Sequence, residues 1–564
     1  MKFTEITYSR VDMEQVETQF TGLLDAFQQA TSFEEQDKAM GQLNELRQEV
    51  ETAREVAQIR HTINTEDPFY KAEQDYWDEA SPLYQGLISR YYESIIHSAY
   101  RTELENKWGA QLFRLAETTL RTFSPEVVAD LQEENRLTSQ YTALIASAKI
   151  MFEGEERNLP QLIPFQKSTD RQLRKRAFEA KYQFLEQHTA ELDRIYDSLV
   201  KVRSRIATKL GFANFVELAY ARLNRTDYNA DMVAAFRAQV HEHIVPVATK
   251  LIERQRERIG VDSMKYYDLD FGFATGNPTP KGSPEWIVNN GKRMYAELSD
   301  ETNEFFTFML ENDCLDLVSK KGKASGGYCT YMSHYKLPFI FSNFNGTSGD
   351  IDVLTHEAGH AFQVYVSRRF EVPEYHFPTY EACEIHSMSM EFLTWPWMEL
   401  FFEEDTQKYK FDHLSGALLF IPYGVAVDEY QHAVYEKPEM SPQERKETWR
   451  EIERKYLPYR NYDENAFLEA GGYWQQQAHI YRDPFYYIDY TLAQICAFQF
   501  WKRAQDNADQ AWSDYLALCK EGGSKSFTEL VAFAKLYSPF EDGCIQSVIG
   551  EIESWLQAVD DKRL

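Results

Sequence analysis

The run His356-Glu357-Ala358-Gly359-His360 contains the residue types that hydrolytic metal chemistry requires. The surrounding segment, 350–366, is predicted to be a helix, and on a helix positions i and i+4 share a face. His356 and His360 therefore present two imidazoles side by side, as zinc ligands must. Glu357 lies about 60° around the helix from His360, next to the metal without needing to bind it. That place suits a general base acting on the hydrolytic water.

The rest of this helix distinguishes a metal site from two ordinary buried histidines. Asp352 and Gln363 continue the polar stripe of the histidines along a helix that is otherwise mostly apolar. Burying such a stripe without using it is unfavourable. Gly359 sits in mid-helix, where glycine costs about 1 kcal/mol relative to alanine. Close approach of another backbone would explain this glycine, and both observations favour the metal site.

A catalytic zinc site needs a third protein ligand and an open position. The extended metzincin pattern is excluded, because Gln363 and Val366 stand where it requires glycine and histidine. A second predicted helix, 380–395, offers three glutamates on one face: Glu381, Glu384 and Glu391. Their spacing alone does not choose among them. His386 lies about 200° from Glu384 on this helix and points away.

With these residues the chain resembles the zinc oligopeptidases of the thimet oligopeptidase and oligoendopeptidase F family, most closely the bacterial oligoendopeptidase F or Pz-peptidase type. The family has His-Glu-x-Gly-His and, just over 20 residues later, a Glu-x-x-Ser ligand helix, which Glu384-Ile-His-Ser387 matches. The resemblance thus selects Glu384 as the third ligand of one Zn²⁺ per chain. Glu391 matches a second family acid. Many members have His at the position of Gln363, which is not a family ligand.

Two strand-like runs, 328–332 and 338–344, precede the metal helix. The short connection between them predicts a hairpin in a small sheet. An extended peptide could add itself to the edge of that sheet and present its scissile carbonyl to the metal. Gly326 and Gly327 would leave room for such a substrate, with Tyr328 beside them. The two glycines could instead serve only a turn.

Asp483 and Pro484 predict the start of a helix near the C-terminus. That helix carries three tyrosines that share a face pairwise: Tyr486, Tyr487 and Tyr490. Aromatic residues at this spacing are usually core. In the resembled family, however, a histidine and a Tyr-x-x-Tyr helix line the cleft opposite the metal. The resemblance therefore assigns His479 and these tyrosines to the oxyanion that amide hydrolysis develops. Its register is loose by one residue, so Tyr486 and Tyr487 are alternatives.

Composition excludes several other classes of protein. The formal net charge of −29 argues against a nucleic-acid partner. No apolar run approaches 20 residues, so no membrane partner is expected, and the first ten residues lack the apolar stretch of a secretory signal. Six scattered cysteines without a Cys-x-x-Cys pair are typical of free thiols in a reducing compartment. These features predict a cytoplasmic protein, whereas they leave the oligomeric state open.

The 564 residues, 43% of them hydrophobic, suffice for a large core. The first half is glycine-poor and amphipathic, with a predicted antiparallel helix pair over 14–63. We therefore predict a mostly α fold, and the resemblance implies two lobes around a deep central channel. A small antiparallel β-sheet should lie beside the zinc helix. The predicted domains are an N-terminal helical lobe, 1–190, and a catalytic region, 191–564, with the lobes interleaved in sequence.

The predicted function is zinc-dependent hydrolysis of internal bonds in short unfolded peptides, with Glu357 as the general base. A carboxypeptidase or dipeptidyl carboxypeptidase on the same scaffold is the alternative within the enzyme class. Outside that class, the alternative is a helical scaffold with a closed structural zinc site. Four protein ligands and no open position would identify such a scaffold.

Overall fold

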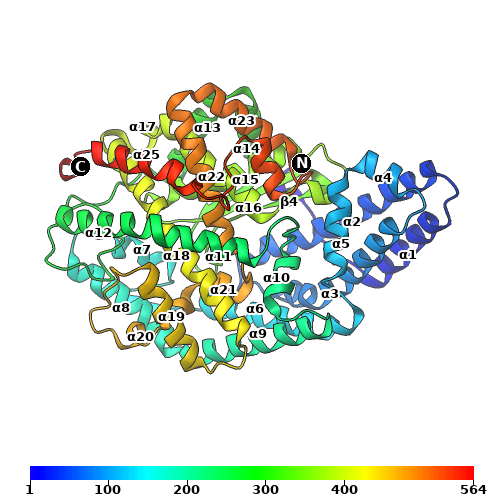
Figure 1. Cartoon of the computed structure of the whole chain (residues 1–564), viewed down its shortest axis with the longest axis horizontal. Helices are drawn as coiled ribbons and strands as arrows, with labels where there is room; N and C mark the ends of the chain where they lie inside the picture. The colour runs from blue at the N-terminus through cyan, green and yellow to red at the C-terminus, as the bar shows by residue number, and fades with distance from the viewer.

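Helices make up most of the protein, and a computed structural model describes residues 1–564 (Figure 1). The mostly α fold that the sequence predicts is confirmed. The helices of the first half are α1 (Met13–Gln29), α2 (Phe33–Ile63), α3 (Pro68–Ile96), α4 (Arg101–Trp108), α5 (Ala110–Leu120), α6 (Val128–Ala146), α7 (Ile163–Gln166), α8 (Arg171–Gln187), α9 (Thr189–Lys209), α10 (Phe215–Arg222), α11 (Ala230–Gln239) and α12 (Val245–Ile259). Those of the second half are α13 (Pro284–Leu298), α14 (Asp300–Glu311), α15 (Gly349–Ser367), α16 (Tyr380–Leu393), α17 (Glu399–Phe402), α18 (Thr406–Glu436), α19 (Pro442–Tyr456), α20 (Ala466–Glu469), α21 (Ala478–Arg482), α22 (Tyr487–Asp506), α23 (Ala508–Glu521), α24 (Phe527–Phe533) and α25 (Cys544–Ala558).

The helices α1–α5 form one end of the molecule, at the right of Figure 1. Their starts follow from side chains that accept the free N–H groups of the first turn: Asp12 caps α1 and Ser32 caps α2. The predicted helix pair over 14–63 is confirmed as α1 and α2, which pack against each other. This end of the molecule has an apolar cluster of its own, to which later parts of the chain contribute only Val372 and Tyr375 as buried members.

A buried ion pair ties these helices to the rest of the protein. Arg47 of α2 donates to Glu374 across 2.5 Å, and the two side chains are only 3% and 9% exposed. Tyr92 of α3 donates to the same carboxylate. Next to it, the hydroxyl of Tyr375 accepts the backbone N–H of Leu112 across 2.8 Å. Because Glu374 lies a few residues before α16, the N-terminal helices are anchored close to a helix of the candidate site.

Three helices at the centre of the protein carry most of the predicted site residues. α16 packs against both α15 and α22 (Figure 1). Gly359 lets α15 and α16 approach closely, since a Cβ at this position would lie 2.6 Å from Cα of Ser387 and 2.7 Å from the carbonyl oxygen of His386. The close backbone approach that the mid-helix glycine predicts is therefore confirmed.

β-Structure is limited to two small sheets. β1 (Ile150–Phe152) and β2 (Glu155–Arg157) form a separate hairpin. β4 (Tyr328–Met332) and β5 (Leu337–Phe344) form the predicted antiparallel hairpin beside α15. β3 (Leu315–Val318), which was not predicted from the sequence, pairs with β5 in parallel. β5 is consequently the central strand, and β4 is an edge strand.

None of the helices combines the length and the apolar character that crossing a membrane requires. All six cysteines are free, and all but Cys329 are buried, in agreement with the absence of paired cysteine motifs.

Candidate active site

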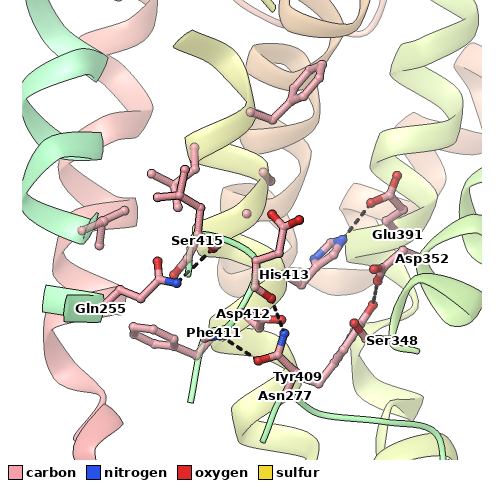
Figure 2. Close-up of a pocket in the computed structure, with 18 of the residues that line it drawn as sticks. Gln255, Asn277, Ser348, Asp352, Glu391, Tyr409, Phe411, Asp412, His413 and Ser415 are labelled. Carbon is pink, nitrogen blue, oxygen red and sulfur yellow. Dashed lines mark hydrogen bonds and ion pairs between the residues drawn. The ribbon is translucent and has the colours of Figure 1, made fainter. Parts of the chain in front are cut away.

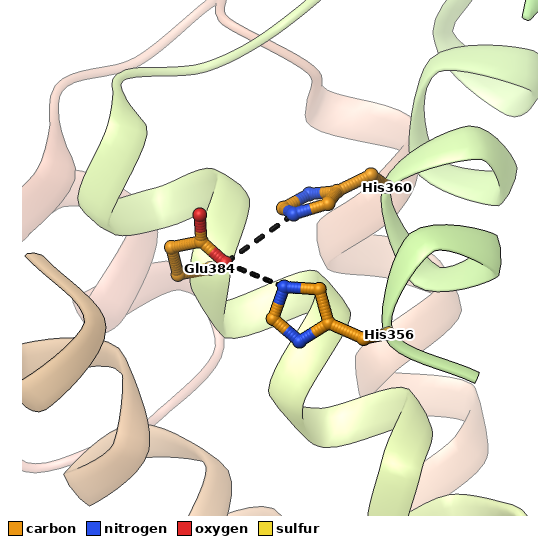
Figure 3. Close-up of side chains that lie close together, drawn as sticks. All are labelled: His356, His360 and Glu384. Atoms are coloured by element: carbon orange, nitrogen blue, oxygen red, sulfur yellow. Dashed lines mark ion pairs between the residues drawn. The ribbon is translucent and has the colours of Figure 1, made fainter. Parts of the chain in front are cut away.

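The side chains of His356, His360 and Glu384 converge on one another (Figure 3). The histidines lie one turn apart on α15, and Glu384 comes from α16. Oε2 of Glu384 lies 3.1 Å from Nε2 of His356 and 3.3 Å from Nε2 of His360. One ligand atom of each residue lies within 4.8 Å of the other two. The three side chains could therefore hold one metal ion.

The chemistry of these atoms fits a cation. Nδ1 of His356 donates to Glu391 across 2.7 Å, so a neutral ring directs the lone pair of Nε2 at Glu384. Two acceptors that face each other at 3.1 Å repel unless a proton or a metal cation lies between them. Burial alone would raise the pKa of Glu384, but positive charge on the two imidazoles beside it holds this pKa well below its usual value, so the carboxylate favours a cation next to it. Two imidazoles and one carboxylate are also the donor set of many catalytic zinc sites.

Glu391 lies behind His356 and belongs to a chain of hydrogen bonds. Its second oxygen lies 2.7 Å from Nε2 of His413. Trp395 donates its indole N–H to Nδ1 of His413 across 3.1 Å. An indole N–H can only donate, so the proton of a neutral His413 must be on Nε2, where it is donated to Glu391. Figure 2 shows His413 and Glu391 joined in this way. Hydrogen bonds of this kind fix the orientation of a ligand histidine.

Glu381, the remaining candidate on α16, lies away from the two histidines. The residue is 1% exposed, and neither of its carboxylate oxygens has a hydrogen-bond partner. Burial raises the pKa of Glu381, whereas the positive charge of Arg225 opposes this rise. Among the three glutamates that share the face of α16, only Glu384 lies within reach of both histidines.

Glu357 lies beside the three candidate ligands with one oxygen free. The residue is 6% exposed, and its Oε2 has no hydrogen-bond partner. Burial raises the pKa of the carboxyl group, although the two neighbouring histidines counteract this. Gly327 leaves space for the side chain, because a Cβ at Gly327 would lie 3.1 Å from Oε1 of Glu357. A desolvated, unpaired carboxylate is a good proton acceptor for a water molecule beside it.

His479 presents an N–H group to the same region. Tyr423 donates its hydroxyl to Oε1 of Gln477 across 2.8 Å, which orients the Gln477 amide with Nε2 as the donor. That Nε2 lies 2.8 Å from Nδ1 of His479, so a neutral His479 carries its proton on Nε2. Burial lowers the pKa of His479 and favours this neutral form. Nε2 lies 3.2 Å from the hydroxyl of Tyr490.

The three tyrosines differ in what they contact. Tyr486 donates its hydroxyl to Oε1 of Glu384, and Tyr490 lies next to His479. The ring of Tyr487 lies 4.9 Å from the ring of His479. The expected helix start at Pro484 is wrong, because α22 begins at Tyr487. The residue between, Phe485, has a φ of +67°, which is incompatible with a helix.

A cavity of about 650 Å³ adjoins these groups (Figure 2). Its walls include five residues of the candidate site: Glu391, His413, His479, Tyr487 and Tyr490. Other parts of the wall come from α12, α18 and the segment 269–277, with residues such as Gln255, Asp270, Asn277, Asp412 and Ser415. Cavities of this size bind small molecules and short peptide segments.

Comparison with known proteins identifies the family of this chain. The model described as Peptidase family M3 matches residues 165–275 and 290–548, which is more than half of the chain. The chain belongs to peptidase family M3. The model of the Peptidase M3 N-terminal domain matches residues 3–123 of this M3 peptidase.

Two solved structures resemble this M3 peptidase over its whole length. A Pz peptidase A with a bound inhibitor is 64% identical, with a TM-score of 0.99 and full coverage of both chains. A putative oligoendopeptidase F from Bacillus anthracis is 62% identical, with a TM-score of 0.95, and the match covers 100% of this chain and 99% of that one. The oligopeptidase PepF of Bacillus subtilis is 22% identical over 473 residues, which span 77% of this chain and 66% of PepF. The predicted family and the predicted class of enzyme, a peptidase, are confirmed.

The predicted substrate-binding residues of this M3 peptidase lie at the start of the edge strand. Gly327 borders Glu357, whereas Gly326 adopts a φ of +95° and has open space around it. The hydroxyl of Tyr328 lies 2.7 Å from Oγ1 of Thr62 in α2. Tyr328 therefore links the edge strand to the N-terminal helices.

Three residues of the site were missed from the sequence: His413, Gln477 and Tyr423. His413 hydrogen-bonds to Glu391 and Gln477 to His479, both of which the sequence singled out. Tyr423 contacts Gln477 and so reaches His479 indirectly. Gln477 stands two positions before His479, which is the one local signal that could have suggested it. Nothing in the sequence around His413 or Tyr423 relates them to residues of other helices.

Proposed function

We propose that this M3 peptidase is a zinc-dependent endopeptidase that hydrolyses internal bonds of short unfolded peptides. The observation that carries the proposal is the convergence of His356, His360 and Glu384 beside the desolvated carboxylate of Glu357. The adjoining cavity of about 650 Å³ has room for a short peptide segment but not for a folded domain. The names oligopeptidase and oligoendopeptidase among the relatives agree with such a substrate.

In this proposal the ligands of one zinc ion are His356, His360 and Glu384. Bound zinc would act as a Lewis acid that polarises the scissile carbonyl and makes a water molecule more acidic. Glu391 keeps His356 in the tautomer that directs Nε2 at the metal, and Tyr486 keeps Glu384 in place. Each of these partners leaves the ligand with one orientation.

In the proposed reaction Glu357 transfers protons, and His479 and Tyr490 donate hydrogen bonds to the substrate. Glu357 takes a proton from the attacking water, whose oxygen bonds to the carbonyl carbon. Nε2–H of His479 and the hydroxyl of Tyr490 donate to the oxygen that becomes negative, with Tyr487 in the wall beside them. Glu357 then gives its proton to the leaving amine as the C–N bond breaks.

The substrate is proposed to lie along the edge strand β4. Its free edge can pair with an extended peptide, and Gly326 and Gly327 offer no side chain that would obstruct it. We also retain the N-terminal helical lobe, 1–190, and the catalytic region, 191–564, with two interleaved lobes that enclose the peptide. A cytoplasmic location remains part of the proposal.

A peptide that is blocked at both ends and internally quenched tests this function. The wild-type protein should cleave it, 1,10-phenanthroline should abolish cleavage, and added zinc should restore it. The variant Glu357→Gln should still bind zinc, while its kcat falls about 10²–10⁴-fold. Cleavage only of peptides with a free end would indicate an exopeptidase, and substantial activity of zinc-loaded Glu357→Gln would refute the role of Glu357.

A further inference from the structure

Phe485 has a backbone conformation that a bulky side chain rarely adopts. Its φ of +67° lies in the left-handed region, which is strained for an aromatic residue. The residue directly precedes Tyr486, whose hydroxyl donates to Glu384. Strained residues persist only where the surrounding structure holds them, and they cluster at functional sites.

Two buried side chains, one from α18 and one from the connection between α10 and α11, hold both polar backbone groups of Phe485. The N–H of Phe485 donates to Oε1 of Gln431 in α18 across 2.9 Å. Its carbonyl oxygen accepts a hydrogen bond from Nη2 of Arg225 across 2.6 Å. Gln431 is fully buried, and its Nε2 donates to the carbonyl oxygen of Val427, which fixes the orientation of the amide. Neither partner belongs to the helix that carries the tyrosines.

Arg225 also holds the helix that follows Phe485. The same Nη2 lies 2.7 Å from Oδ1 of Asp489, and both side chains are fully buried. Asp489 stands on α22 directly before Tyr490. A single guanidinium therefore connects the residue before Tyr486 with the residue before Tyr490.

The phenyl ring of Phe485 cannot leave this position easily. Phe485 is fully buried, with its ring centroid 4.9 Å from that of His432 and 5.8 Å from that of Tyr435. Relaxation of φ to an ordinary value would have to break the hydrogen bonds or displace the ring. In either case Tyr486 would move, because only one peptide bond separates it from Phe485.

We propose that Arg225 and Gln431 are positioning residues, which hold Phe485 in its left-handed conformation and so keep the Tyr486 hydroxyl on Glu384. The inference rests on the proposed function in one respect, the role of Glu384 as a zinc ligand. Neither positioning residue contacts the candidate ligands themselves. The effect of Gln431 reaches the metal through Phe485 and Tyr486, whereas Arg225 also holds α22 through Asp489.

Zinc affinity, measured by competition with a chromophoric chelator, tests the proposed positioning role without relying on enzymatic activity. Gln431→Leu removes the acceptor for the N–H of Phe485 and should weaken zinc binding about tenfold, at the lower end of the effect of losing a partner that orients a ligand. Arg225→Lys keeps a positive charge near Asp489 but loses the fork geometry, and it should have a similar effect.

A double-mutant cycle separates the proposed route from general damage. Tyr486→Phe removes the hydroxyl and should weaken zinc binding by itself. In that background, Gln431→Leu should have no further effect, because the group through which it acts is gone. If Gln431→Leu weakened zinc binding equally in both backgrounds, or not at all in the wild type, the proposal would be overturned. Failure of the wild-type protein to bind zinc would instead overturn the proposed function.

Two matched variants control for the loss of buried hydrogen bonds as such. Arg445 is 1% exposed and, like Arg225, pairs with one carboxylate, of Asp197, and one carbonyl, of Pro438. Gln36 is a buried glutamine of α2 that donates to the carbonyl of Phe27. Arg445→Lys and Gln36→Leu should lower the urea midpoint yet leave zinc affinity unchanged. If these controls lost as much zinc affinity as Gln431→Leu, the effect of Gln431→Leu would be explained by general structural damage, and the inference would be contradicted.

Discussion

Replacement of Gly359 by alanine should disturb the metal site more than the stability of the fold. The new Cβ would lie 2.6 Å from Cα of Ser387, whereas ordinary contact begins at 3.4 Å. α15 and α16 would therefore have to separate by about 0.8 Å at this point, the difference between those two distances. His360 is the next residue on one helix, and Glu384 lies one turn away on the other.

This displacement is large on the scale of metal coordination. Zinc–ligand distances vary by about ±0.2 Å, so a shift of about 0.8 Å moves His360 and Glu384 out of joint reach of one ion. We expect zinc affinity to fall about 100-fold or more. Overpacking typically destabilises a protein by about 1–3 kcal/mol, and the greater helix propensity of alanine offsets about 1 kcal/mol of that. The free energy of unfolding should consequently fall by about 2 kcal/mol or less.

Chelator competition on the metal-free protein and urea unfolding measure the two effects separately. Gly41→Ala in α2 is a suitable control, since a Cβ at Gly41 would have no atom within 4 Å. That variant should gain up to about 1 kcal/mol of stability from helix propensity and bind zinc as the wild type does. Unchanged zinc affinity in Gly359→Ala would refute the claim that contact between the two helices sets the geometry of the site.

Three further predictions concern single side chains. Glu384→Ala should abolish zinc binding in the chelator assay, whereas Glu381→Ala should preserve it; the reverse order would reassign the ligand. Tyr490→Phe should lower kcat about 10²-fold with KM nearly unchanged, and a change confined to KM would contradict an oxyanion role. Burial disfavours the charge of Glu134, but two neighbouring arginines outweigh it and hold its pKa at about 2, below the ordinary 4.5. The carboxylate therefore stabilises the fold above pH 4.5, by about 3 kcal/mol, and this contribution declines as the pH falls from 4.5 towards 2. As the pH falls from 6 to 3, the urea midpoint of the metal-free protein should decline less steeply in Glu134→Gln than in the wild type. Equal slopes in the two proteins would contradict the stabilising role of the Glu134 carboxylate.

The helix that carries His356 and His360 was predictable because helical periodicity is a local property. The spacing of His356 and His360 and the need for a close contact at Gly359 both follow from residues within one segment. The choice among glutamates does not. Three of them share a face of α16, and which one reaches the histidines depends on how α16 crosses α15. Only the family resemblance selected Glu384 in advance, and the structure places it with both histidines.

Other parts of the site depend on contacts that no local pattern encodes. His413 reaches Glu391 from α18, and Gln431 reaches Phe485 from the same helix. Sequence rules place a helix start at Pro484, and an aromatic residue is among the last expected at a positive φ. Phe485 adopts that conformation because distant residues bind its backbone groups. Tertiary contacts here outweigh the local preference, which is typical of functional sites.

The ion pair between Arg47 and Glu374 has a practical consequence for anyone seeking a smaller version of this enzyme. Removal of helices α1–α5 would leave Glu374 in a partly apolar environment without its cation. It would also expose the faces of Val372 and Tyr375 that these helices cover. The residue numbers suggest a detachable appendage, but the truncated remainder would be prone to aggregate. The β1–β2 hairpin is a better place to shorten the chain, because Met151 in the middle of β1 is 70% exposed and the hairpin forms a sheet of its own.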